Sequence, residues 1–399
     1  MGEHVTNVQR WNPVIVMTMI VAIFVFFGIS IGTTGVLWAE ILPVLRMDDA
    51  LFGTLSLISP MVSIFILLFA GNFIERIGKR TSVSVGLVLL ALAPYSLSVA
   101  GSPFHFALVN VLYGLGYGIV ELGINSVTLD WERERQKSVM NYVHAAFCAG
   151  AIVAGLGVGQ LLAAAWEYTT ILSTVALIAM GAAVINALIA YPPTQHDESA
   201  DSASAGAAIR LLINNPIVLT LGIVSFCATF GESVAITWSV LHLRDLGASA
   251  FIGGAGFALF NTIMFIGRMT NNSVVERFGV VVSFTISAVA ITVAGIMLVT
   301  LNNLWAAVIA FAILGFGVAG GVPTALTAGA RFVPGQNSAL SGALMSVNYL
   351  SFIISPPLIG VLATNTTRQS ALFVVVLIGL MMIVFTRRLA YVTQKTNAQ

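Results

Sequence analysis

The sequence predicts an all-α membrane protein in which twelve transmembrane helices form two six-helix, pseudo-symmetric halves. Charged residues make up 8% of the 399 positions and hydrophobic residues 58%, whereas soluble domains average about 25% charged residues. This much apolar surface cannot be enclosed in one soluble core, so we expect the lipid bilayer to surround the chain. A net charge of +1 gives no electrostatic reason to expect a nucleic-acid partner.

Twelve apolar runs are long enough to cross a bilayer, which takes roughly 20 residues of helix. They cover residues 13–42, 50–73, 81–101, 104–129, 139–165, 169–191, 215–243, 251–271, 280–301, 304–330, 338–363 and 369–386. A membrane barrel would show short alternating segments of about ten residues, so we predict that each run is a helix. No small-residue cleavage site follows the first run, so it is predicted to remain as the first span.

The basic residues predict the orientation of these spans. If the N-terminus is cytoplasmic, the outer loops receive Arg46, Arg244 and Arg368, and every other Lys and Arg falls on the inner side. This distribution follows the positive-inside rule. We therefore expect a multi-pass protein of the cytoplasmic (inner) membrane with both termini in the cytoplasm.

One long polar stretch interrupts the apolar runs. YPPTQHDESADSASAGAAIR, residues 191–210, combines a Pro-Pro pair with acids, serines and small residues and has no apolar period. It is typical of a flexible linker. We predict that it divides the chain into an N-terminal six-helix bundle, residues 1–190, and a C-terminal one, residues 211–399.

The two halves repeat each other at a shift of about 200 residues. GNFIERIGKR at 71–80 has a counterpart in NNSVVERFGV at 271–280, LGYG at 115–118 in LGFG at 314–317, and Trp38 in Trp238. Each match occurs in the same span of its half. Parallel repeats of this kind place a substrate site near the membrane midplane, between the halves.

These residues carry a family resemblance. The loop G-x-x-x-E-R-x-G-K-R and its degenerate copy, preceded by Gly267-Arg268, resemble the signature loops of the major facilitator superfamily. Four stretches, AEILP at 39–43, GIVELGINS at 118–126, FIGRMTNNSVVERF at 265–278 and GGVPTALTAGA at 320–330, are similar to the fucose-permease-like group of proton-coupled sugar transporters. The resemblance implies alternating-access symport of a proton with a small polar solute, and a sugar is the solute that it favours most. Other members of that group export sugars or carry unrelated solutes.

Three acids lie inside predicted spans, where a charged side chain costs roughly 2.5–3.5 kcal/mol at a helix centre. Glu121 lies nine residues before Asp130, about 13–14 Å along a helix and so near the middle of the membrane. We predict that Glu121 takes up and releases the coupled proton, since acids at this depth mark ion or substrate paths, and a protonated glutamate that only bonds a neighbouring helix is the alternative. For Glu40 the resemblance implies a role in proton or substrate handling, and an interfacial pair with Arg46 is the alternative. Glu232 is predicted to contact the solute.

Further candidates for solute contact come from polar and aromatic residues in the spans. With Glu232, the side chains of Trp238 and His242 are expected to form a polar-aromatic stripe in the seventh span. The other candidates are His144, Asn141, Trp38, Tyr117 and Asn348. Helix–helix hydrogen bonds and interfacial aromatic belts are the alternative explanations for the asparagines and tryptophans.

The repeated loops are predicted to act as a conformational latch on the cytoplasmic side. Acids and bases at helix ends can pair with the charges of neighbouring helices. The residues concerned are Glu75, Arg76, Lys79, Arg80, Glu276, Arg277 and Arg268. Ordinary positive-inside charge would explain the basic residues but not the repeated E-R-x-G.

No motif of an enzyme appears, because the chain has no phosphate-binding glycine loop, zinc-ligand spacing or nucleophile elbow. We expect no cofactor, no metal site and a monomer. The two cysteines, Cys148 and Cys227, lie in apolar runs and are expected to be structural. The alternatives to a proton-coupled symporter are a proton-driven exporter of drugs or lipids and, more distantly, a non-transporting membrane sensor. Coupling to sodium in place of a proton also stays open.

Overall fold

The computed structural model describes residues 11–70, 76–137, 139–192, 205–333 and 336–397. Its helices are α1 (Pro13–Leu45), α2 (Asp49–Ser56), α3 (Ile58–Phe69), α5 (Lys79–Ser98), α6 (Pro103–Arg135), α7 (Met140–Ala163), α8 (Tyr168–Leu188), α9 (Ala205–Asn214), α10 (Pro216–Asp245), α11 (Ala250–Phe278), α12 (Val280–Thr300), α13 (Leu304–Val318), α14 (Gly321–Phe332), α15 (Asn337–Asn365), α16 (Arg368–Ala371) and α17 (Phe373–Asn397). Twelve helical segments are long and apolar enough to cross a membrane, and the described residues contain no strand. The predicted fold class is confirmed.

Several long helices begin at a polar cap followed by proline. Asn12 accepts hydrogen bonds from the backbone N–H groups of the first turn of α1, and Pro13 occupies the first helical position. Asn215 with Pro216 starts α10 in the same way, and Ser102 with Pro103 starts α6. Such caps satisfy backbone donors that have no partner within the helix, and proline there sacrifices no hydrogen bond.

Three predicted spans are each divided into two helices, the twelfth of them near its start, at Leu372 between α16 and α17. The second span is interrupted at Leu57, between α2 and α3, and the tenth at Ala319 and Gly320, between α13 and α14. Both runs stay long and mostly apolar, so the sequence predicted single helices although Pro60 and Gly320-Gly321 with Pro323 stand at the interruptions. In addition, α9 begins inside the range predicted as linker and packs on α15. Residues 193–204 of that range lie outside the described residues, so the predicted domain division remains a prediction.

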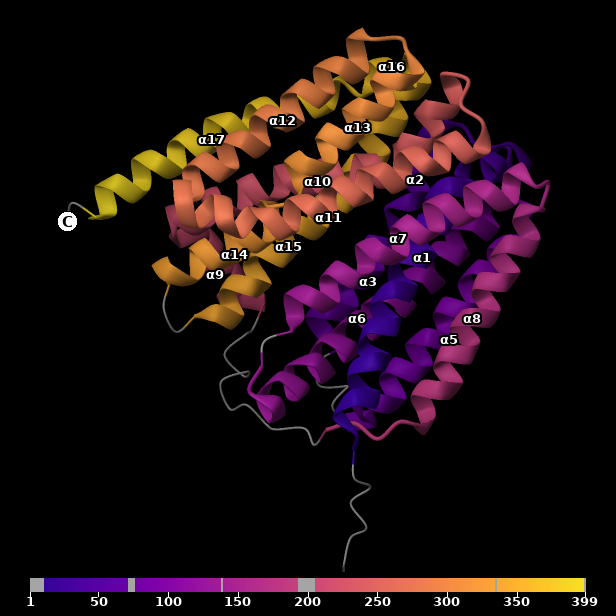
Figure 1. The fold of residues 1–399 in the computed structure, drawn as a ribbon, viewed down its shortest axis with the longest axis horizontal. Coiled ribbons are helices and arrows are strands. Elements are labelled where there is room, and N and C mark those ends of the chain that lie inside the picture. The colour runs from indigo at the N-terminus through magenta and orange to yellow at the C-terminus, as the bar shows by residue number, and fades with distance from the viewer. Residues whose placement is uncertain (1–10, 71–75, 138, 193–204, 334–335, 398–399) are drawn as a thin grey trace, which may run out of the picture.

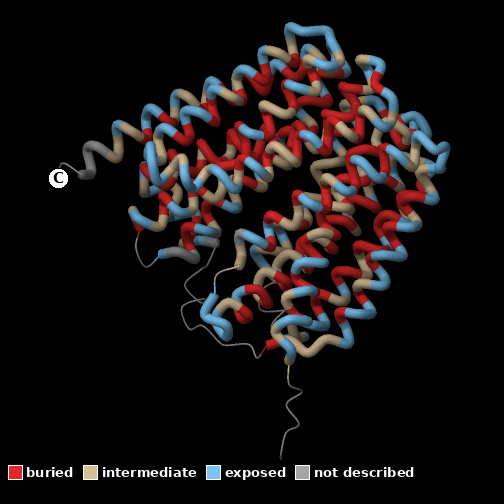
Figure 2. The backbone as a smooth tube through the Cα atoms, viewed as in Figure 1, coloured by how far each residue is buried: buried red, intermediate tan, exposed pale blue. Residues whose placement is uncertain are grey.

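The helices form two groups (Figure 1). We call α1 to α8 the first half and α9 to α17 the second half. Buried positions concentrate on the faces that helices turn toward one another, and exposed positions on the outer faces (Figure 2). Many of these exposed positions carry large apolar side chains, such as Phe104, Leu177 and Leu188, as expected where a bilayer surrounds the protein.

The halves touch most closely at one end of the helices. We call it the Arg368 end, and we call the opposite end, where α8 finishes and α9 starts, the linker end. At the Arg368 end α2 packs on α15, and a Cβ added to Gly53 would lie 2.2 Å from the carbonyl oxygen of Pro356. Likewise α7 packs on α11, where a Cβ on Gly254 would lie 2.2 Å from the carbonyl oxygen of Gly155. Small residues thus let backbones of the two halves meet directly.

Ion pairs reinforce the contact at the Arg368 end. Arg368 binds Asp49 of the first half through Nη2–Oδ1 at 2.8 Å and Nε–Oδ2 at 2.9 Å, and it binds Asp245 of its own half at 2.7 Å. Arg244 of the second half binds Glu40 of the first half at 3.0 Å. The structure therefore holds the halves together at the Arg368 end.

Candidate functional site

Glu121 lies near the middle of α6 and bonds across to the second half. The hydroxyl of Tyr349, near the middle of α15, donates a hydrogen bond to Glu121 Oε2 with an O···O distance of 2.5 Å. Both residues are partly exposed. The strength of this hydrogen bond depends on whether the carboxyl group is protonated and on how far apart the two halves lie.

An aromatic wall adjoins Glu121 in the first half. Tyr117, one helical turn before Glu121, donates a hydrogen bond to Ser30 Oγ of α1 at 2.8 Å. Its ring stacks on Tyr113 at a centroid distance of 5.7 Å and meets the edge of Phe27 at 5.3 Å. Rings next to hydroxyl groups can contact both the apolar faces and the polar edges of a hydroxylated solute.

His144 continues this wall on α7. Its ring lies 4.7 Å from the ring of Phe24, and its side chain is exposed although it belongs to a helix that packs against both α1 and α11. Cys148, one turn further along α7, contacts Arg268 of the second half. His144 therefore faces the space between the halves. Asn141 belongs to α7, and its side chain lies outside what the structure describes.

Glu232 and Arg268 form an ion pair inside the second half. Nη2 of Arg268 lies 3.3 Å from Glu232 Oε1 and 3.4 Å from Oε2, and Nη1 lies 3.5 Å from Cys148 Sγ across the halves. Arg268 was predicted as part of the cytoplasmic latch. It lies ten residues before the end of α11 at Phe278, about 15 Å along the helix, so the structure places it beside the solute candidates.

Glu40 lies apart from Glu121. Ser30, which bonds Tyr117 at the level of the aromatic wall, precedes Glu40 by ten residues on α1, so the carboxyl group is about 15 Å further along the helix. Its partner is Arg244, at 3.0 Å, rather than the predicted alternative Arg46. In this conformation Glu40 belongs to the contact between the halves at the Arg368 end.

Trp38 and Trp238 also lie toward the Arg368 end. Phe52 of α2 separates them, with ring centroids 5.1 Å from Trp38 and 5.4 Å from Trp238. Trp238 is 1% exposed, so a solute cannot stack on it while the halves are in contact here. The two tryptophans, which the sequence repeat predicted to be equivalent, therefore pack with Phe52 into an aromatic plug made from both halves.

His242 and Asn348 are buried within the second half. His242 lies 6.3 Å from the ring of Phe311, and Asn348 Oδ1 accepts hydrogen bonds from Ser225 at 2.8 Å and Thr229 at 3.2 Å. The predicted stripe is therefore divided. At 100° per residue, Trp238 and His242 lie 240° and 280° around the helix from Glu232, so the three side chains do not share one face.

Charged residues of the predicted latch lie at the linker end. Lys79 forms a buried ion pair with Asp130 of α6 at 2.5 Å, within the first half. The side chains of Arg76, Arg80, Glu276 and Arg277 are exposed, and Arg277 lies over the ring of Phe278. Glu75 lies outside the described residues. With the halves in contact at the Arg368 end, the latch between halves stays a prediction for the opposite conformation.

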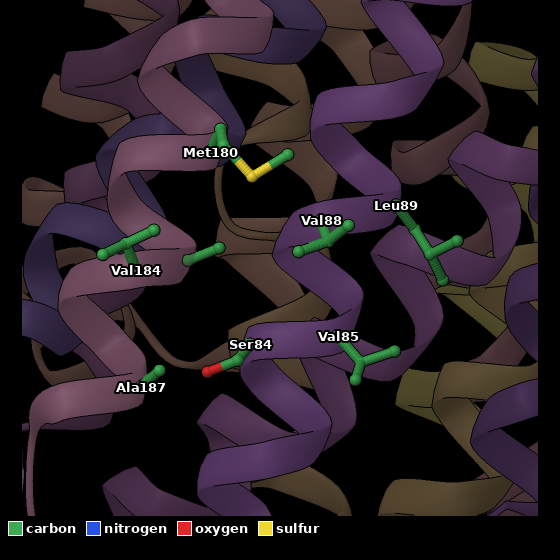
Figure 3. A pocket seen from close by; sticks show the side chains of 8 residues that line it. Ser84, Val85, Val88, Leu89, Met180, Val184 and Ala187 are labelled. Carbon is green, nitrogen blue, oxygen red and sulfur yellow. The ribbon is translucent and has the colours of Figure 1, made fainter.

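A groove of ≈340 Å³ lies away from these residues, between α5 and α8 (Figure 3). Ser84 is the single polar residue among its eight lining residues, which include Val85, Val88 and Val184. Val85 and Val184 are also exposed on the outer face. A groove without charged groups on that face suits lipid chains and offers no site for a polar solute.

Sequence reasoning missed Tyr349, Ser30 and Cys148, and it missed that Arg268 pairs with Glu232. For Arg268 a signal existed, because counting residues back from the end of the predicted E-R-F-G loop places it well inside the membrane. For Tyr349 the sequence shows one of several hydroxyl side chains in its span, and nothing local reveals a partner 228 residues away.

Comparisons with known proteins agree with this architecture. The family model described as Major Facilitator Superfamily matches residues 18–279 and 221–399. An uncharacterized MFS-type transporter of Yersinia pestis is 25% identical over 353 residues, covering 85% of this chain and 87% of the relative. Multidrug resistance protein MdtL of Vibrio parahaemolyticus is 23% identical over 196 residues, covering 47% of this chain and 49% of that protein.

Solved structures share the fold over nearly the whole chain. A bacterial homolog of the human lysosomal transporter Spinster, in an inward-facing and unoccupied conformation, superposes with a TM-score of 0.78 at 14% identity, covering 96% of this chain and 98% of that chain. The nucleoside transporter NupG gives 0.77 at 15% identity, covering 95% and 98%. The E. coli fucose:proton symporter FucP gives 0.61 at 15% identity, covering 94% and 99%.

Proposed function

The chain belongs to the Major Facilitator Superfamily of transporters, and from this premise we propose that it carries a small polar solute, a sugar in first place, together with a proton. The observation that supports coupling best is the Glu121–Tyr349 hydrogen bond, because it joins an acid in mid-membrane to the opposite half. Ionisable residues inside a membrane protein mark ion and substrate paths. The ring and hydroxyl group of Tyr117, one helical turn before Glu121, support a hydroxylated solute.

The cycle that we propose alternates access to this site. Protonation neutralises Glu121, and the occupied site then passes through a state closed at both ends without carrying an unpaired charge through a low-dielectric region. We infer that the site opens at the linker end while the halves are in contact at the Arg368 end, and the distribution of basic residues predicts that the linker end faces the cytoplasm. We place the protein in the inner membrane as a monomer, with proton and solute released into the cytoplasm.

The test is transport in proteoliposomes with radiolabelled sugars under an imposed pH difference. Glutamine keeps the shape and hydrogen bonding of a protonated carboxyl group but releases no proton. Glu121→Gln is therefore expected to abolish accumulation against a gradient and to retain exchange between equilibrated compartments. Accumulation by the variant would refute Glu121 as the coupling site, and accumulation driven by a sodium gradient in the native protein would refute proton coupling.

A second candidate function is the proton-driven export of amphipathic drugs or lipids. The partial match to the multidrug resistance protein MdtL favours it. The same liposomes distinguish the two functions. Lipophilic cations expelled against a gradient would support the exporter, and sugars accumulated in the direction of the proton would support the symporter.

A further inference from the structure

We propose that Arg268 recognises a carboxylate on the solute, so that the transported solute is a small hydroxylated acid, such as a hexuronate, rather than a neutral sugar. This inference rests on the proposed function, because it assigns the solute class of the same site. It is carried by the position of Arg268, by how loosely its guanidinium is bound, and by the wall of hydroxyl and aromatic groups opposite it.

Packing alone does not require an ion pair at the position of Arg268. A charged pair inside a membrane protein loses hydration on both partners, and apolar residues of similar size are often as stable or more stable there. Arg268 and Glu232 lie in the interior of α11 and α10, and their side chains are 23% and 11% exposed. A guanidinium that remains partly accessible at this depth is available to a ligand.

The guanidinium of Arg268 is incompletely bound. It has five N–H donors, yet one nitrogen reaches both oxygens of Glu232 at 3.3 and 3.4 Å, and another reaches the sulfur of Cys148, a weak acceptor, at 3.5 Å. Within the described residues no acceptor is recorded for Nε. Charge-assisted N–H···O bonds in optimal geometry are about 2.7–2.9 Å long, so these contacts fall short of that geometry.

Arg368 serves as a comparison, because its salt bridges have a structural role and show close, well-aligned geometry. Its Nε and Nη2 bind the two oxygens of Asp49 side by side at 2.9 and 2.8 Å, and its Nη1 binds Asp245 at 2.7 Å. The contrast indicates that Glu232 acts as a resident counter-ion for Arg268, which a solute carboxylate with two free oxygens can replace in the fork geometry.

The rest of the site fits a hydroxylated ring attached to that carboxylate. Arg268 contacts Cys148, His144 lies one turn away on the same helix, and the ring contacts of His144 with Phe24 and of Phe27 with Tyr117 continue to the wall beside Glu121. The Arg268–Glu232 pair is neutral as a unit. An anionic solute adds one negative charge to the site, and the proton taken up with it adds one positive charge. The occupied site therefore has the same net charge as the empty site.

Equilibrium binding to the purified full-length protein tests this assignment without any gradient. The probes are pairs that differ in one group, D-galactose with D-galacturonate and D-glucose with D-glucuronate, titrated by calorimetry. We expect one uronate to bind at least about tenfold more tightly than its neutral partner, as expected for a charge-assisted bidentate contact. Equal or weaker binding of both uronates, or no binding of either, would overturn the proposal.

Two variants with opposite expected effects on uronate binding distinguish recognition of the solute by Arg268 from a purely structural role of its ion pair. Arg268→Gln should remove the preference for the uronate, whereas Glu232→Gln should keep or strengthen uronate binding, because it removes the competitor. Arg268→Lys keeps the charge without the fork and should retain part of the preference, which covers the case in which the glutamine variant fails to fold. Arg210→Gln, an exposed arginine of α9, is the control and should change nothing.

Equal losses of binding in Arg268→Gln and Glu232→Gln would show a structural pair and overturn the proposal. Failure of the proposed function has a different signature. A protein that prefers uronates but shows no pH-driven accumulation refutes proton coupling and leaves the role of Arg268 standing.

Discussion

The bridge between Arg368 and Asp49 offers the sharpest test of how the conformation is held. Asp49→Asn removes the part of the network that crosses between the halves, while Arg368 keeps its bond to Asp245 at 2.7 Å. The variant therefore leaves no unpaired buried arginine. Asp245→Asn is the matched control, because it removes a contact of the same chemistry that lies entirely within the second half.

The size of the effect follows from the geometry and exposure of the pair. Asp49 accepts from Nε and Nη2 of Arg368, and the two side chains are 14% and 24% exposed. A hydrogen bond to a charged group contributes about 1.5–3 kcal/mol, and partial exposure with its solvent screening reduces the whole bridge to about 1–2 kcal/mol. Losing it should lower the ratio of molecules closed at the Arg368 end to molecules open there by roughly 5- to 30-fold.

Distances between spin labels measure this ratio directly. One label at Gly101 and one at Asn302, exposed loop positions of the two halves at the Arg368 end, report its opening. A second pair at Arg135 and Glu276 reports closure of the linker end. We expect Asp49→Asn to lengthen the first distance and shorten the second. An unchanged distribution, or an equal shift in Asp245→Asn, would refute the assignment of this bridge to conformational control.

Three further predictions concern topology, the latch and packing. Single cysteines at Ser102 and Ser202 should react with membrane-impermeant reagents from opposite sides, and labelling from one side would contradict the twelve-span orientation. Arg76→Ala should slow transport and leave equilibrium solute affinity within a few-fold, whereas complete loss of binding in a folded variant would place this loop in the site. Gly155→Leu should populate the state open at the Arg368 end, because a Cβ there lies 2.7 Å from the carbonyl oxygen of Gly254; a label distance as in the native protein would show that this close approach is dispensable.

Local pattern was sufficient for the spans. In a bilayer each helix must satisfy its own backbone hydrogen bonds and present apolar side chains along its length, so the information for a span lies within that span. The caps at Asn12 and Asn215 are local for the same reason. The interruptions at Leu57 and Ala319 escaped prediction because the apolar runs continue past them, although Pro60 and Pro323 are local signals of a break.

The sequence by itself determined the family resemblance, the twelve helices and the unusual acid Glu121, and it singled out Glu232 and Arg268 without connecting them to each other. Only the tertiary structure decided that Glu121 meets Tyr349, that Arg268 faces Glu232, and that Glu40 belongs to the contact at the Arg368 end. The physical reason is geometric. The partner of a buried polar side chain depends on the rotation of each helix about its axis and on which helices pack together. Packing sets both through contacts between residues far apart in the chain, and no local pattern encodes them.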